Sequence, residues 1–82
     1  MAAPAIDLDM RNALYKAAMR PEGRLSGTVI GKFYQIRWYD GVDFGGVICT
    51  VDRDQGDALL RELRGMLDKY RDMAVQFGGD HR

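Results

Sequence analysis

The sequence predicts a small α+β domain: a helix, a three-stranded antiparallel meander and a long C-terminal helix (α-β-β-β-α), with both helices on one face of the sheet. Apolar residues recur near every 3.6 positions at both ends of the chain, and at every second position between 25 and 51. A chain of 82 residues has room for one core, so we expect a single compact domain over 1–82. Residues 1–6 and 79–82 are expected to fray.

The first helix is expected to start at Asp7 or Asp9, since either side chain can cap it, and to run to about Arg20. Pro21 then prevents a further helical turn. The apolar side of this helix collects Leu8, Met10, Leu14, Ala17 and Ala18. Several of these side chains are small, so the helix should lie close to its neighbour.

The middle of the chain predicts two hairpins. Gly31-Lys32 suits a two-residue turn, because glycine accommodates the first central position. This turn places Ile30 opposite Phe33, with the remaining pairs being Val29–Tyr34, Gly27–Ile36 and Leu25–Trp38.

A second hairpin is expected to close through residues 41–44, and Gly45-Gly46 would then allow a bulge or a tight return. In this register Trp38 faces Val47 and Ile36 faces Cys49. The face predicted for the core collects Leu25, Val29, Tyr34, Ile36, Trp38, Val47, Cys49 and Val51. The opposite, open face collects Ser26, Thr28, Ile30, Phe33, Gln35, Arg37, Tyr39, Ile48 and Thr50. Trp38 is expected to be buried between the sheet and the long helix.

The last helix is expected to be capped by Asp52 or Asp54, with Asp57 in its first turn. Its apolar stripe is Leu59, Leu60, Leu63, Met66, Leu67, Tyr70, Met73, Ala74 and Phe77, and the polar side holds Arg61, Glu62, Arg64, Asp68, Arg71 and Asp72. A helix of about 23 residues spans about 34 Å, whereas a strand of about seven residues spans about 23 Å. The first helix, a second copy of the chain or another partner must therefore cover Tyr70, Met73 and Phe77.

No catalytic residue is predicted, and the protein is not expected to be an enzyme. Cys49 lies in a strand on the predicted core face, and His81 lies in the C-terminal tail after two glycines. The acidic residues Asp40, Asp43, Asp52, Asp54 and Asp57 form a candidate acidic patch, but turns and helix caps account for them. A calcium loop from Asp52 would need a ligand at Gly56 and a glutamate at Leu63, so no metal or cofactor is predicted.

The charge balance and the cysteine content limit which partners and which cellular compartment can be expected. Twelve basic and twelve acidic residues cancel, so no overall field draws the chain to nucleic acid or to an anionic membrane. One cysteine, no apolar run of membrane-spanning length and no basic-then-apolar N-terminus lead us to expect a reducing cytoplasm.

The open face is the predicted partner-binding surface, through Phe33, Arg37, Tyr39 and Ile48. The helix end at Tyr70, Met73 and Phe77 is the predicted self-association surface, giving a homodimer.

The element order also resembles that of the double-stranded RNA-binding domain, a family in which basic residues at the start of the last helix bind phosphates. Here residues 54–58 read Asp-Gln-Gly-Asp-Ala and would repel phosphate. A nucleic-acid-binding module that uses Arg24, Lys32 and Arg37 near the open face therefore remains an alternative.

In length, compact α+β character and lack of a catalytic set or targeting signal, the chain resembles small phage-encoded inhibitors of the anti-CRISPR type. This resemblance implies stoichiometric binding to a subunit of a host nucleoprotein complex, in the host cytoplasm. Many such inhibitors are strongly acidic, whereas this chain is neutral. The expected function is therefore a protein-binding inhibitor or adaptor, with a nucleic-acid-binding module or a small toxin–antitoxin-like dimer as alternatives.

Overall fold

The computed structural model describes residues 6–78 and the side chains of residues 6–74. The fraying expected at residues 1–5 and 79–82 concerns residues outside this range. Ile6, in contrast, is half-buried and packs against the core, so the prediction that it frays is wrong.

Helix α1 spans Leu8–Ala18, slightly shorter than predicted, and Asp7 caps its start. The Asp7 Oδ1 atom accepts a hydrogen bond of 2.9 Å from the Met10 backbone N–H. The buried residues of α1 are Met10, Leu14, Ala17 and Ala18, as predicted. Leu8 is instead 71% exposed, because residues two apart on a helix point about 200° apart and Met10 faces the core.

Strands β1 (Gly23–Ile30), β2 (Phe33–Asp40) and β3 (Asp43–Asp52) form the predicted antiparallel meander in the order β1-β2-β3. The first hairpin has the predicted register throughout, from Ile30 opposite Phe33 to Leu25 opposite Trp38. Gly31 has a φ of 60°, which glycine adopts without the steric penalty of a side chain. The first hairpin prediction is confirmed.

The second hairpin is tighter than predicted. Asp40 pairs with Asp43, so Gly41-Val42 alone forms the turn, with Gly41 at a φ of 63°. Ile36 faces Cys49 as predicted, but Trp38 faces Gly46 instead of Val47. Two register shifts on β3, between Ile36/Arg37 and between Trp38/Tyr39, take up the residues that the shorter turn releases.

Helix α2 spans Gly56–Gly78, and a 3-10 turn, η1 (Arg53–Gln55), precedes it. Asp57 lies in the first turn of α2, as predicted. The predicted cap by Asp52 or Asp54 is wrong, because both residues belong to the 3-10 turn or its boundary, and Asp52 makes no side-chain cap bond. The Arg53 N–H donates to the Lys32 carbonyl at 3.1 Å, which ties η1 to the first hairpin.

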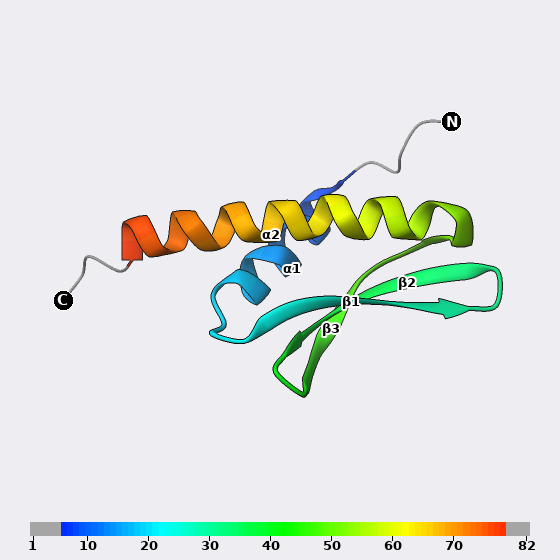
Figure 1. Cartoon of the computed structure of the whole chain (residues 1–82), viewed down its shortest axis with the longest axis horizontal. Coiled ribbons are helices and arrows are strands. Elements are labelled where there is room, and N and C mark those ends of the chain that lie inside the picture. The colour runs from blue at the N-terminus through cyan, green and yellow to red at the C-terminus, as the bar shows by residue number, and fades with distance from the viewer. Residues whose placement is uncertain (1–5, 79–82) are drawn as a thin grey trace.

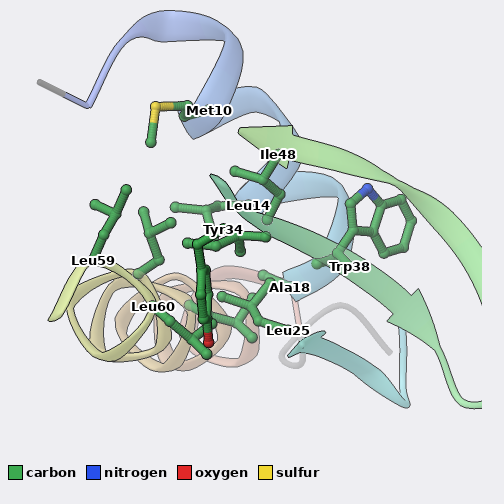
Figure 2. Packing of buried hydrophobic residues seen from close by; sticks show 13 residues of the cluster. Met10, Leu14, Ala18, Leu25, Tyr34, Trp38, Ile48, Leu59 and Leu60 are labelled. Atoms are coloured by element: carbon green, nitrogen blue, oxygen red, sulfur yellow. The ribbon is translucent and has the colours of Figure 1, made fainter. Parts of the chain in front are cut away.

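Both helices lie on the same side of the sheet, so the fold has two layers (Figure 1). The core between the layers is formed by Met10, Leu14, Ala17, Ala18, Leu25, Tyr34, Ile36, Trp38, Ile48, Leu59, Leu60, Leu63 and Leu67 (Figure 2). All three strands and both helices contribute to it, so each element depends on the others for burial.

Tyr34 fixes the start of α2 against the sheet. Its ring lies so close to Gly56 of α2 and to Gly27 of β1 that a Cβ atom at either glycine would overlap it. Burial raises the pKa of the Tyr34 hydroxyl, and the nearby Asp57 raises it further. The close packing of the ring on both glycines therefore holds the start of α2 against the sheet.

The free edge of β1 is covered by two arginines of α2. The Arg64 guanidinium donates to the Leu25 carbonyl at 3.2 Å. The Arg71 guanidinium donates to the Gly23 carbonyl at 2.6 Å and to the Ala17 carbonyl at 3.4 Å. The sequence analysis placed both arginines on the polar side of α2 and did not predict these bonds, which form because their long side chains reach from the flank of the helix to the strand.

Trp38 is buried as predicted, at 8% exposure, but against different neighbours. Its ring covers the backbone of Gly45 and Gly46 on β3. It also lines a surface depression with Lys16, Met19 and Arg20 from the end of α1. Figure 2 shows the indole on the side of the core away from Leu59 and Leu60 of α2, so the sheet and α1 bury this residue.

Candidate functional site

The open face of the sheet is the one that the helices leave uncovered. Along β2 the buried Tyr34, Ile36 and Trp38 alternate with Phe33, Gln35, Arg37 and Tyr39, of which Phe33 is exposed and the others are half-buried. Strand pairing arranges this face in four rows: Ile30–Phe33–Asp52, Thr28–Gln35–Thr50, Ser26–Arg37–Val47 and Arg24–Tyr39–Phe44.

A bulge in β3 exchanges the predicted positions of Val47 and Ile48. Cys49 pairs with Ile36 and Val47 pairs with Arg37, which leaves Ile48 as the extra residue. Ile48 enters the core at 8% exposure, and Val47 lies on the open face at 48% exposure. The prediction that Ile48 belongs to the binding surface is therefore wrong, because an added residue inverts the alternation of the strand beyond it.

A second irregularity brings Phe44 to the same face. Beyond the pair Trp38–Gly46 the register shifts again, so that Tyr39 pairs with Phe44 and Gly45 has no partner on β2. The Trp38 ring occupies the space where a Gly45 side chain would lie, since a Cβ atom there would come within 2.5 Å of the ring. Phe44, which the four-residue turn had placed in a loop, is 58% exposed on the open face.

An aromatic and basic cluster forms at this end of the open face. The Tyr39 and Phe44 rings meet edge to face, with centroids 5.6 Å apart. The Arg24 guanidinium carbon lies 4.7 Å from the centroid of the Tyr39 ring, in a cation–π arrangement. The Arg24 Nε also donates to the Gly41 carbonyl at 3.0 Å, which ties the cluster to the second turn.

Polar side chains occupy the centre of the face. The Arg37 Nε donates to Gln35 Oε1 at 2.7 Å. The Gln35 amide nitrogen in turn donates to Thr50 Oγ1 at 3.4 Å. The first of these bonds holds the guanidinium of Arg37 toward Gln35, whereas its backbone pairs with Val47.

The predicted binding residues therefore separate. Arg37 and Tyr39 lie together with Phe44 and Val47, two residues that the sequence analysis missed. Phe33 lies at the other end of the face beside Ile30, and the polar row through Gln35 separates it from Arg37. The Gly45-Gly46 pair was the available signal for the bulges, but it did not indicate which residues they would expose.

The predicted acidic residues do not form one patch. Asp40 and Asp43 face each other at the second turn. Asp52 pairs with Phe33 at the opposite end of β2, about 23 Å away along the strand, and Asp54 and Asp57 follow it in the chain. Asp52 and Asp54 also share a surface depression with the basic residues Lys32 and Arg53.

At the helix end, Tyr70 is covered by α1. The rings of Tyr15 and Tyr70 stack with centroids 4.3 Å apart and an angle of 3° between their planes. Met73 is 44% exposed. Phe77 belongs to α2, but its side chain lies outside the described part of the structure, as does His81. The first helix, a second copy or another partner was expected to cover this apolar stripe, and the first helix covers Tyr70.

The Cys49 thiol is half-buried in β3 beneath α1. Burial, and secondarily the charge of Asp7, raises its pKa to about 11. Such a thiol is protonated at neutral pH and is a poor nucleophile. Among the described residues, no group of three or more His, Cys, Asp or Glu side chains is arranged to hold a metal ion.

Comparison of the chain with protein-family models, with curated proteins and with solved structures gives no match. Within residues 6–78, neither helix combines the length and the apolar character needed to cross a membrane.

Proposed function

We propose that this chain is a non-enzymatic protein-binding module, an inhibitor or adaptor that acts by stoichiometric binding through the open face of its sheet. The observation that carries this proposal is the cluster of Tyr39, Phe44 and Val47 around Arg37, on a face that neither helix covers. Aromatic and arginine side chains are enriched among the residues that dominate protein–protein binding energies.

The composition of the face supports a partner that also exists free in solution. Apolar side chains lie at both ends, whereas Ser26, Thr28, Gln35 and Thr50 form a polar centre. Mixed surfaces of this kind are typical of partners that associate and separate, because each must be stable alone. The inhibitor class that the sequence resembles works in this way, and a subunit of a nucleoprotein complex is the partner that this resemblance implies.

Affinity capture from a nuclease-treated native lysate tests the proposal. Phe44→Ala removes an exposed ring of the cluster, and Arg37→Glu reverses the charge in the neighbouring row. Each is expected to reduce the captured partner at least about tenfold, the range of an interface hot spot. The matched control is Leu8→Ala, which removes an apolar side chain from α1 that is 71% exposed, compared with 58% for Phe44.

Thermal denaturation of each variant separates binding from folding. Phe44→Ala and Leu8→Ala are expected to melt within a few degrees of the parent chain, because exposed substitutions change stability by about 0.5 kcal/mol or less. Arg37→Glu replaces a half-buried side chain and loses its bond to Gln35, so a cost of about 0.5–1.5 kcal/mol is expected. Undiminished capture by both open-face variants would refute the proposal. Equal losses in the Leu8→Ala control would place the partner on the helix layer instead.

A further inference from the structure

Arg37 lies at the centre of the open face with no carboxylate beside it. The neighbouring positions in its own row and in the adjacent rows are Ser26, Val47, Thr28, Gln35, Thr50, Arg24, Tyr39 and Phe44. None of these side chains is acidic, and one is a second arginine. No acidic side chain therefore occupies the sheet positions around Arg37, which favours a ligand of negative charge at this residue.

The guanidinium of Arg37 is already oriented for a ligand. Its Nε is used in the 2.7 Å bond to Gln35 Oε1, and the side chain is half-buried among its neighbours. The two terminal Nη groups point their donors in a fixed plane, which matches the two oxygens of a carboxylate. Because the side chain is held before binding, little conformational entropy is lost when the ligand arrives.

Arg24 provides a second fixed guanidinium close by. It lies on β1 opposite Tyr39, diagonally across from Arg37, at a Cα separation of roughly 7–8 Å. Its Nε is bonded to the Gly41 carbonyl at 3.0 Å, and its plane lies over the Tyr39 ring. Arg24 is thus held toward the second turn and Arg37 toward Gln35, so the two guanidinium groups can bind two separate acidic groups on this face.

The rings at this site are poorly placed to stack on nucleotide bases. Arg24 covers one face of Tyr39, and Tyr39 and Phe44 contact each other edge to face. Binding of single-stranded nucleic acid relies on free aromatic faces and on a basic track along the backbone. Here the row of Phe33 instead contains Asp52, and the chain has a net charge of zero. These features favour an acidic protein segment over nucleic acid.

We propose that the open face binds an acidic, partly apolar segment of a protein partner. In this arrangement Arg37 and Arg24 each bind a different carboxylate of that segment, and its neighbouring aliphatic side chains contact Phe44 and Val47. This inference rests on the proposed function and specifies the partner chemistry for the same face.

The experiment measures fluorescence anisotropy of three labelled probes with the full chain: a short peptide of alternating aspartate and valine, its counterpart with lysine for aspartate, and an oligothymidylate of equal length. The aspartate peptide is expected to bind most tightly. Arg37→Gln and Arg24→Gln should each weaken it about five- to tenfold, the range for loss of a hydrogen bond to a charged group. Arg61→Gln, on an exposed part of α2, removes the same charge elsewhere and should have no effect.

Each alternative result has a defined meaning. Equal affinity of the arginine variants and the parent chain for the aspartate peptide would overturn the inference. Tighter binding of the oligothymidylate, lost steeply with added salt, would overturn it in favour of nucleic acid. If Phe44→Ala abolishes capture of the lysate partner while both arginine variants retain it, the proposed function stands and this inference fails. If none of the three variants affects capture, both fail.

Discussion

Cys49 is the side chain whose chemistry is most changed by this fold. Its thiol lies between β3 and the N-terminal end of α1, where burial and the nearby charge of Asp7 both disfavour the thiolate. The resulting pKa of about 11 leaves roughly one thiolate in a thousand at pH 8. The residue therefore serves as a small apolar group of the core.

This pKa predicts slow thiol chemistry in the folded protein. At pH 8, alkylation of Cys49 by iodoacetamide should be about 100-fold slower in the native chain than in the chain unfolded in urea, because far less thiolate is present. The native rate should continue to rise about tenfold per pH unit up to pH 11. Mass spectrometry of quenched samples measures both rates. A native rate equal to the unfolded rate would show that the thiol is exposed and ionises normally.

Edge strands are the elements that need protection in a three-stranded sheet, since their free N–H and C=O groups can pair with another chain. On β1, the guanidinium groups of Arg64 and Arg71 occupy the carbonyls of Leu25 and Gly23. On β3, the two irregularities interrupt the regular row of backbone groups. The two edge strands are thus protected from pairing with another chain in different ways. Side chains of α2 cover the edge of β1, and the bulges make the edge of β3 irregular.

Arg71 also joins three elements. It belongs to α2, and its guanidinium donates to a carbonyl at the end of α1 and to another at the start of β1. Arg71→Ala is therefore expected to lower the free energy of unfolding by about 1–3 kcal/mol, because the Ala17 and Gly23 carbonyls lose their charged donor. Urea denaturation followed by circular dichroism measures the change. Arg61→Ala is the control and should stay within about 0.5 kcal/mol of the parent. Equal stability of both variants would mean that the Arg71 bonds contribute nothing.

At the scale of the whole molecule, both helices retain exposed apolar side chains. Leu8 and Met19 lie at the two ends of α1 and Met73 lies on α2, and Tyr15 stacks on Tyr70 between the two helices. An exposed apolar residue such as Met73 can pair with its own copy around a two-fold axis. Self-association through the helix end remains a prediction, now centred on Met73, because Tyr70 is already covered by α1.

Sedimentation velocity over a range of concentrations checks this prediction. The parent chain is expected to sediment faster as its concentration rises. Met73→Asp should keep it monomeric, because a carboxylate at the interface would have to be desolvated. Val42→Asp introduces the same charge at the second turn, on a side chain that is 92% exposed, and should leave the association unchanged. A parent chain that stays monomeric at every concentration would rule out this dimer.

Local patterns explain why the first hairpin was predictable and the second was not. Gly31-Lys32 fixed one turn, and the alternation from Leu25 to Trp38 then admitted a single register with a buried face. In the second hairpin the turn takes Gly41-Val42, and β3 accommodates the difference with its irregularities. The strand alternation of Val47-Ile48 fits either arrangement, so only packing decides which of the two is buried.

The amino-acid sequence by itself determined the order of elements, the first register, a cap at Asp7 or Asp9 and the apolar side of α2, because these depend on turn chemistry and periodicity within short segments. The tertiary structure alone decided the membership of the open face. The Trp38 ring packs over Gly45, and Ile48 is buried in the core. Strand β3 therefore has two bulges, which place Val47 and Phe44 on the open face near Arg37. It likewise decided that Arg71 turns toward β1 and that Tyr15 covers Tyr70. These contacts join residues far apart in the chain, and their energies depend on how the layers fit together, which no local pattern encodes.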